Sequence, residues 1–217
     1  MKKDEFEIID LNEENDASKE RDGMTKSKHS LRYEKQEDDE SFDWKQELKS
    51  WIFTLAITIA VVFVIKNYII INASVPTGSM ENTIMPGDNL FGYRLAYLLE
   101  EPERGDVIFF YFPDDESQKY VKRIIGLPGE KVSIMDGYIY INDSQIPLEE
   151  AYLKEAWTMG TGPFEFEVPE DSYLVLGDNR NSSQDARYWA NSYVTKEKII
   201  GKAIFTYFPF HRWGAIE

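Results

Sequence analysis

The sequence contains no cysteine and only two histidines, His29 and His211. Without cysteine, the chain cannot use disulfides, a thiolate nucleophile, or cysteine-ligated zinc or iron–sulfur centres. A Ser-His-Asp triad would have to use His211, because His29 precedes a long apolar segment and we expect it on the other side of a membrane. The scarcity of histidine therefore removes most hydrolase mechanisms before any motif is considered.

The sequence also lacks a basic stripe. Its formal net charge is −15 and its pI is about 4.6. Phosphate binding needs clustered positive charge, so we predict no nucleic-acid partner. The part that follows the apolar segment, residues 73–217, is long enough to bury the core of a single domain.

The N-terminal residues 1–44 are rich in charge and poor in apolar side chains, with no apolar periodicity. Such a segment cannot bury enough apolar surface to offset the entropy lost on ordering. We predict a disordered, charged tail that serves as a solvated spacer. A binding motif within the tail is the alternative.

An uncharged run, Trp51–Val64, is followed after Lys66 by further apolar residues at 68–71. A membrane-spanning helix needs about 20 mostly apolar residues. Residues 49–70 meet this requirement if the Lys66 amine reaches the far interface. A buried core helix is disfavoured because the run has no polar face, and a cleaved signal peptide because some fifty residues precede it. We therefore predict one transmembrane helix, with its flanks, at 45–72.

Two lysines, Lys45 and Lys49, flank the N-terminal end of this segment. Positive charge favours the cytoplasmic side, so we expect a cytoplasmic N-terminus. Residues 73–217 then form a domain on the outer face of the membrane.

The pattern after residue 73 is that of short strands and turns. Runs rich in β-branched and aromatic residues, bounded by turn residues, predict strands at 107–112, 120–125, 173–176 and 199–205. The runs 131–135 and 138–141 flank Asp136-Gly137, which predicts a hairpin. Helices are expected only at Leu90–Leu99 and Leu148–Trp157. The fold class is thus mainly β, an antiparallel sheet domain preceded by a single N-terminal transmembrane helix.

Two stretches offer a nucleophile and a base. Ser79 follows Gly78, which would let a peptide backbone approach closely, and the Thr77 hydroxyl and the Ser79 N–H could form an oxyanion hole. Lys122 shares a strand face with Tyr120 and Ile124, so burial would lower its pKa as a general base requires. Taken alone, Ser79 could equally belong to an ordinary loop, and Lys122 could be a surface residue on an edge strand.

A third stretch, residues 177–187, is strongly polar and directly follows a predicted apolar strand. It is either a solvated loop or a buried hydrogen-bonded scaffold. Two arginines and two aspartates interleaved with amides suit the scaffold.

Together the stretches resemble the bacterial type I signal peptidases, also called leader peptidases. The family's Pro-Ser-Gly-Ser-Met-x-Pro-Thr-Leu box is matched at 76–84, its Arg-Gly-Asp box at 104–106, its lysine box at 122–132, and its Gly-Asp-Asn-Arg-x-x-Ser-x-Asp-x-Arg box at 177–187. The resemblance covers residues from about 45 to 217, in order and in register.

The resemblance implies a serine endopeptidase with Ser79 as nucleophile and Lys122 as general base. It implies that Thr77 lends its hydroxyl to the oxyanion hole and that the Ser183 hydroxyl holds the lysine amine in place. A structural network beneath the site is implied for Arg123, Asp178, Arg180, Asp185 and Arg187. No metal and no cofactor are expected.

Four positions depart from the family's pattern. Asn82 stands where proline is usual, Asn181 and Ser182 where Asp and Asn are commoner, and Ala186 where serine is common. Without proline, the loop behind the nucleophile is expected to be less rigid. The nucleophile, the base and the lysine-orienting serine are all retained.

The implied substrates are preproteins, whose signal peptides lie in the same bilayer and are cut after an Ala-x-Ala-like site. We expect the substrate to add as a strand to Ser74, Val75 and Pro76 on one side and to Tyr120 and Val121 on the other. A monomer in the bacterial cytoplasmic membrane is expected.

Two other functions compete with this one. A signal-peptidase-like assembly factor would bind peptide segments without cutting them, and retention of both Ser79 and Lys122 argues against it. A self-cleaving regulator with a Ser/Lys dyad would usually carry a DNA-binding domain in place of the membrane segment.

Overall fold

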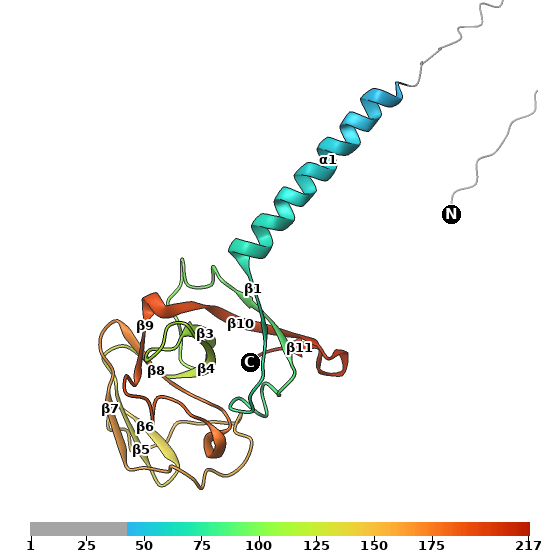
Figure 1. Ribbon diagram of the computed structural model, residues 1–217. Helices are drawn as coiled ribbons and strands as arrows, with labels where there is room; N and C mark the ends of the chain where they lie inside the picture. Colours follow the sequence, from blue (N-terminus) through green and yellow to red (C-terminus); the bar gives the residue numbers. More distant parts are fainter. Residues whose placement is uncertain (1–42) are drawn as a thin grey trace, which may run out of the picture. The chain divides into compact units, whose positions relative to one another are not determined.

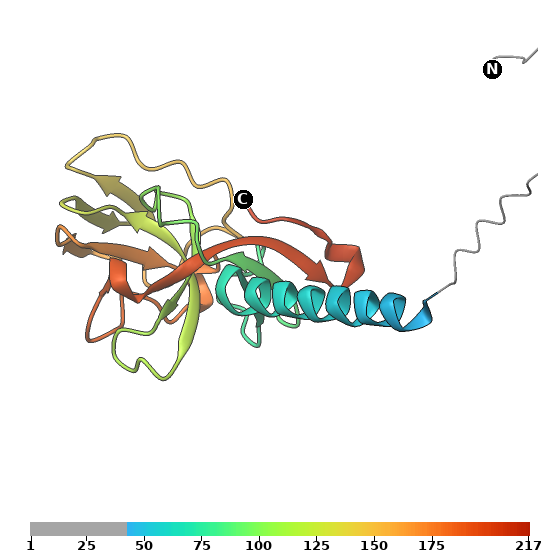
Figure 2. The same ribbon diagram turned by 90° about the horizontal axis from the view of Figure 1, so that it is seen from above.

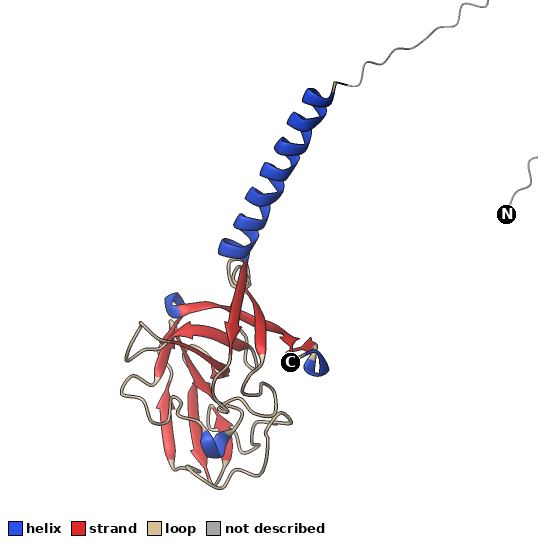
Figure 3. Cartoon of the chain, turned by 45° about the vertical axis from the view of Figure 1, so that its right-hand side comes forward, coloured by secondary structure: helices blue, strands red, loops and turns tan. Residues whose placement is uncertain are grey.

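The computed structural model describes residues 43–217, so nearly all of the tail predicted at 1–44 lies outside the described residues. Helix in this part of the chain is confined to α1 (Trp44–Val64), a π-helical turn η1 (Ile65–Ile69) and three 3-10 turns, η2 (Arg180–Ser182), η3 (Lys196–Lys198) and η4 (Phe210–Arg212). The remainder is strand and loop (Figure 3). The predicted fold class, mainly β after one apolar helix, is confirmed.

Helix α1 has 21 residues, none of them buried by protein. At 1.5 Å per residue it is about 31 Å long, close to the thickness of a hydrocarbon core. Two polar side chains are satisfied within the helical segment, because Thr58 Oγ1 donates to Thr54 O (2.8 Å) and Asn67 Nδ2 donates to Phe63 O (2.7 Å). Within residues 43–217 this is the one helix long and apolar enough to cross a membrane.

The larger sheet has eight strands in the order β1-β2-β10-β3-β4-β8-β9, with β11 paired to β10, and every pairing is antiparallel. Its strands are β1 (Ile70–Ser74), β2 (Asn89–Tyr93), β3 (Val107–Tyr111), β4 (Lys119–Gly126), β8 (Ser172–Leu176), β9 (Tyr193–Thr195), β10 (Ile199–Phe208) and β11 (Gly214–Ala215). Figure 1 shows β3, β4 and β8 side by side, and the long orange-red strand of Figure 2 is β10, which pairs with β2 and with β3.

A smaller sheet has three strands in the order β6-β5-β7, namely β5 (Lys131–Met135), β6 (Tyr138–Ile141) and β7 (Phe164–Glu167). Asp136 and Gly137 join β5 to β6 with positive φ angles of 52° and 79°, the conformation that a tight two-residue hairpin turn needs. The hairpin predicted from the sequence is therefore confirmed.

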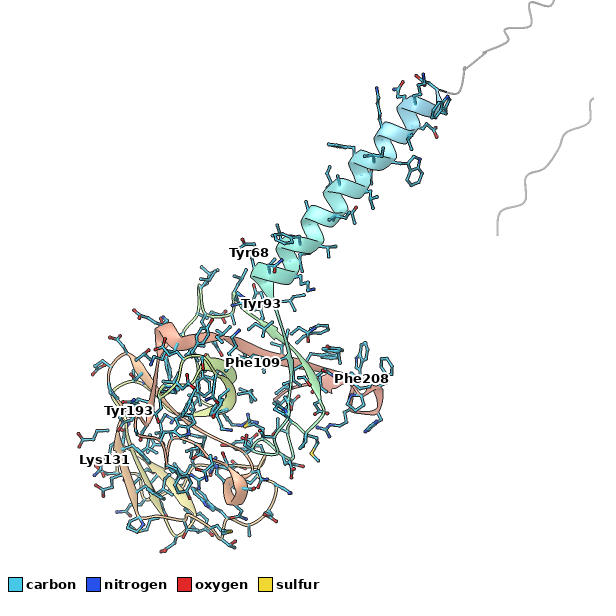
Figure 4. All side chains as sticks on the ribbon, in the orientation of Figure 1. Tyr68, Tyr93, Phe109, Lys131, Tyr193 and Phe208 are labelled. Atoms are coloured by element: carbon cyan, nitrogen blue, oxygen red, sulfur yellow. The ribbon has the colours of Figure 1, made fainter. Side chains whose placement is uncertain are left out.

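Three apolar clusters form the core. One joins the two sheets through Ile125, Val132 and Leu174, and a second packs Met80 and Ile84 against the strands β1, β2, β3 and β10. The third packs β3 against β4 and β8. Figure 4 shows Phe109 of the second cluster among packed side chains and Lys131 at the surface. Both faces of β4 are buried from Lys122 onward, so this strand can place charged side chains inside the protein.

Both predicted helices are wrong. Residues 90–93 belong to β2, where Leu90 pairs with Ala73 and with Thr206, and residues 94–99 form turns. Pairing on both sides, with alternate burial along the strand, outweighs the helical preference of the leucines. Residues 148–157 are irregular, because their side chains reach several separate partners described below.

Candidate active site

Ser79 lies on the loop that joins β1 to β2. The base of the loop is closed where the Val75 N–H donates to Asp88 O (2.9 Å). The side chains of Met80 and Ile84 are fully buried, and the Ile84 N–H donates to Met80 O (2.8 Å). The apolar residues after Ser79 therefore anchor the loop, while Ser79 itself stays half-buried.

Lys122 lies on β4, opposite Ile108 of β3. Its neighbours on the same strand face, Tyr120 and Ile124, both pack on the third core cluster. Lys122 is only 4% exposed, and its Nζ is hydrogen-bonded to Ser79 Oγ. The structure thus brings together the two residues that the sequence suggested as nucleophile and base, which are 43 positions apart in the chain.

Burial lowers the pKa of Lys122 from 10.5 to about 8, because desolvation disfavours the ammonium form. The carboxylates of Asp185 and Asp178 oppose this effect, and the Arg187 guanidinium adds to it. An amine with this pKa is partly neutral near neutral pH and can accept a proton from a hydroxyl.

The loop that follows β8 holds the β1–β2 loop, here called the nucleophile loop after Ser79, by its backbone carbonyl groups. The Asn179 N–H donates to Ser79 O (3.1 Å), and Asn179 Nδ2 donates to Gly78 O (2.9 Å). A Cβ at Gly177 would overlap Ser79 O and the Ser183 hydroxyl. Glycine at position 177 is therefore what allows the two loops to approach each other.

Ser183 is 3% exposed, and its hydroxyl has no hydrogen-bond partner among the described residues. An unpaired buried hydroxyl is uncommon and calls for an explanation. That Ser183 orients the Lys122 amine stays a prediction, because no hydrogen bond between the two is present in the described part of the chain.

Arg123, the residue after Lys122, forms a buried ion pair with Asp178. Its Nε and Nη2 donate to the two carboxylate oxygens over 2.9 and 2.7 Å, and both side chains are at most 2% exposed. Thr83 Oγ1 donates to the same carboxylate (2.5 Å), and the Tyr152 ring lies 4.0 Å from the guanidinium. The pair thereby ties β4 to the loops on both sides of the dyad.

A second group of buried charges lies deeper. Arg187 Nε and Nη2 donate to Asp185 over 2.7 and 2.8 Å, and Arg180 Nη1 and Nη2 donate to Glu150 over 3.0 and 2.5 Å. The Trp157 ring lies about 5 Å from both guanidinium groups, at 4.9 Å from Arg180 and 5.0 Å from Arg187. The network implied by the resemblance is thus brought together as a buried scaffold, not as a solvated loop.

Sequence reasoning missed four members of this network: Thr83, Glu150, Tyr152 and Trp157. One signal could have indicated Glu150. The expected network held three arginines but only two aspartates, and a buried arginine requires a carboxylate partner. The other three lie in stretches with no distinguishing pattern.

Both strands expected to receive the substrate have an open edge. Within residues 43–217, strand β1 ends the strand order and pairs with β2 alone. The Val75 backbone forms hydrogen bonds with residues 87 and 88, on the side of β2. The backbone groups of Ser74 and Pro76 therefore face away from β2, toward the open edge. The Thr77 side chain is exposed beside them.

Strand β4 is open on one side at its beginning. Residues 119–122 pair with β3, whereas pairing with β8 starts at Arg123. Since the Phe112 N–H donates to Gln118 O (3.0 Å), alternation turns the backbone groups of Val121 away from β3. The half-buried Tyr120 ring packs beside this edge, 4.6 Å from the Phe112 ring.

Among the residues that the structure describes, no histidine takes part in this arrangement. His211 is exposed on η4, and within residues 43–217 it makes no hydrogen bond to Ser79. In the same described range no three His, Asp or Glu side chains are grouped so that they could hold a metal ion.

Comparison with known proteins gives consistent matches. A family model described as signal peptidase, peptidase S26, matches residues 48–208. The chain is 39% identical over 147 residues to a probable signal peptidase I-2 of Synechocystis sp., covering 65% of each protein. It is 35% identical over 176 residues to a signal peptidase I of Leptolyngbya laminosa, covering 78% of this chain and 84% of that protein. A crystal structure of a signal peptidase I from Enterococcus faecalis V583 is similar with a TM-score of 0.40 and 36% identity, over 48% of this chain and 97% of that one.

Proposed function

Because the chain belongs to the signal peptidase family, peptidase S26, we propose that it is a membrane-anchored serine endopeptidase that removes signal peptides from exported preproteins. The observation that carries the proposal is the hydrogen bond between the buried Lys122 amine and Ser79 Oγ. A buried lysine with a lowered pKa beside a serine hydroxyl supplies a base and a nucleophile without histidine, metal or cofactor.

In the proposed mechanism, neutral Lys122 accepts the Ser79 hydroxyl proton while Oγ attacks the scissile carbonyl. The tetrahedral intermediate collapses when the Lys122 ammonium returns the proton to the departing amine, leaving an acyl-enzyme on Ser79. Lys122 then deprotonates a water molecule that attacks the ester carbonyl, and it returns this proton to Ser79 Oγ as the acyl group leaves. The same group thus acts as base and acid in turn.

Three further groups are proposed to assist this chemistry. The Ser79 N–H and the Thr77 hydroxyl stabilise the oxyanion, since hydrogen-bond donors placed where charge develops lower the barrier. The unpaired, buried hydroxyl of Ser183 holds the Lys122 amine in its reactive orientation.

The open edges of β1 and β4 support binding of the preprotein as an added strand. An extended peptide would pair with the outward backbone groups of Ser74 and Pro76 on one side and Val121 on the other. The side chains of Val75 and Tyr120 then limit the space for the residues before the cut, which favours small residues there.

Helix α1 supports the proposed location. It is long enough to cross a bilayer and has no residue buried by protein. Lys45 and Lys49 favour a cytoplasmic N-terminus, which puts residues 73–217 on the outer face of a bacterial cytoplasmic membrane as a single-pass monomer. Anchoring beside the membrane-embedded signal peptide raises its effective concentration.

The test is cleavage of a model preprotein by the full chain in lipid vesicles, with the new N-terminus identified by mass spectrometry. We expect one cut after a small-x-small site, lost when the residue before the cut is changed from Ala to Phe. Binding of the preprotein without cleavage would favour the assembly factor instead. Cleavage at scattered sites would contradict the proposed specificity.

A further inference from the structure

The segment 148–159, here called the strap, crosses the active-site network between β6 and β7. Two of its side chains anchor it firmly. Glu150, whose side chain is 6% exposed, pairs with Arg180, and the Trp157 indole packs against Arg180 and Arg187 and donates from Nε1 to Met159 O (2.7 Å). The strap is therefore fixed to the buried scaffold at two points seven residues apart.

A further set of hydrogen bonds holds the second half of the strap. Asn181 accepts hydrogen bonds at Oδ1 from the N–H groups of Thr158 (2.8 Å) and Met159 (2.9 Å). Its Nδ2 donates to Glu155 Oε1 and to Ala156 O, both over 2.9 Å. The asparagine that departs from the family's pattern at position 181 is thus fully used in holding the strap.

Between these anchors the strap reaches the nucleophile loop. Lys154 Nζ forms an ion pair with Glu81 Oε2 (2.5 Å), and Asn82 Nδ2 donates to Tyr152 O at the long limit of 3.5 Å. Glu81 and Asn82 follow Ser79 by two and three residues, so the strap contacts the loop directly behind the nucleophile.

The backbone turns sharply at this point. Asn82 has a φ of 71°, a left-handed conformation that asparagine adopts more readily than most residues and that proline cannot adopt. The Glu81 N–H donates to Gly78 O (3.2 Å), and the Glu81 carboxylate folds back so that a Cβ at Gly78 would overlap it. The position of this carboxylate is therefore coupled to the backbone that carries Ser79.

We propose that Lys154 is a positioning residue for the nucleophile, acting through its ion pair with Glu81. The proposal rests on the proposed peptidase function. An exposed ion pair contributes little to stability, and Lys154 is 42% exposed, so its loss should leave the fold intact. Its effect should instead lie in the placement of Ser79, where a displacement of about 1 Å can cost on the order of 100-fold in rate.

Lys154→Met should lower kcat for preprotein cleavage about tenfold, an intermediate loss for a small displacement, with KM changed less than about twofold. Glu81→Met should do the same, and the double variant should be no slower than either single one, because both remove one interaction. Lys154→Arg should retain the wild-type kcat. Lys196, whose ion pair with Glu101 is also 2.5 Å long and exposed, supplies the matched control, and Lys196→Met should cleave at the wild-type rate.

Amide hydrogen exchange of residues 77–85 gives a readout that does not depend on cleavage. In Lys154→Met, the amide hydrogens of this segment should exchange about tenfold faster than in the wild type. The thermal midpoint of unfolding should stay within about 2 °C of the wild-type value, because the opening is local. An unchanged kcat and unchanged exchange in Lys154→Met, or additive losses in the double variant, would overturn the proposal. If the wild type cuts nothing, the proposed function fails, while the exchange experiment still decides the role of Lys154.

Discussion

The lowered pKa of Lys122 comes from its surroundings and not from its own chemistry. Its amine is removed from water by burial, and the two carboxylates that act on it are already paired with arginines, Asp178 with Arg123 and Asp185 with Arg187. The carboxylates raise the pKa of Lys122, but desolvation is the larger effect and the Arg187 guanidinium adds to it, so the pKa falls to about 8. The balance leaves the Lys122 amine partly neutral near neutral pH, as the proposed role of general base requires.

This pKa has a consequence for the pH dependence. The base must be neutral to accept a proton, so kcat/KM should rise with pH and level off above an apparent pKa of about 8. The profile is to be measured with a substrate that does not titrate between pH 6 and 10. A flat profile across the range would mean that Lys122 is not the base.

Gly177 provides a second test at a single position. Gly177→Ala should reduce kcat by about 100-fold or more, since the added methyl group overlaps Ser79 O and the Ser183 hydroxyl and must displace one of them. Gly214→Ala is the matched control, because the nearest atom to its Cβ would lie 4.0 Å away. Equal activity of the two variants would show that the contact is not needed.

Among elements, strands were predictable and the irregular segments were not. The runs at 107–112 and 120–125 carry their own signal, since β-branched and aromatic residues between turn residues describe a buried strand regardless of its partners. The strap looked helical because its leucine, alanine and glutamate residues favour helix locally. Its actual path depends on Arg180, Arg123 and Glu81, which are far away in sequence, and no local pattern encodes such contacts.

The same division holds for the site. Ser79 and Lys122 could be predicted because each lies in a recognisable motif. Glu150 and Trp157 contact Arg180 of such a motif from a segment outside it. The path of the loop at Asn82 could not be predicted either. Its positive φ shows that the chain uses a conformation closed to proline, whereas the resemblance alone suggested only a less rigid loop.

The ion pair between β4 and the loop after β8 should dominate the stability of the site. Asp178→Asn leaves the buried Arg123 without its charge partner and should cost about 3–5 kcal/mol in free energy of unfolding. Urea unfolding followed by tryptophan fluorescence measures this. Asp143→Asn, which removes an exposed pair with Lys131, should cost less than about 1 kcal/mol, and a similar loss in both variants would contradict the ranking.

For the molecule as a whole, we expect helix α1 and the β-rich domain to have different roles. No residue of α1 or η1 is buried, so removing residues 1–69 should leave the core intact, at the cost of the hydrogen bond from the Arg94 N–H to Ile69 O. A chain that begins at Ile70 should cleave a short soluble peptide at close to the full rate, yet cleave a vesicle-embedded preprotein at least about tenfold more slowly. Comparing the cleavage rates of the two substrates tests this expectation. Equal losses of rate on both substrates would mean that α1 supports the fold instead.

The measurement that tests the central claim most directly is the single-turnover rate of preprotein cleavage by the wild type, Ser79→Ala, Lys122→Ala and Lys131→Ala. Lys131 on β5, a half-buried strand lysine whose side chain is 38% exposed, serves as the control. We predict that the first two variants lose at least about 1,000-fold, as removal of a nucleophile or its base does, while Lys131→Ala keeps the wild-type rate. Cleavage by Ser79→Ala or Lys122→Ala within tenfold of the wild type would contradict the Ser79–Lys122 dyad.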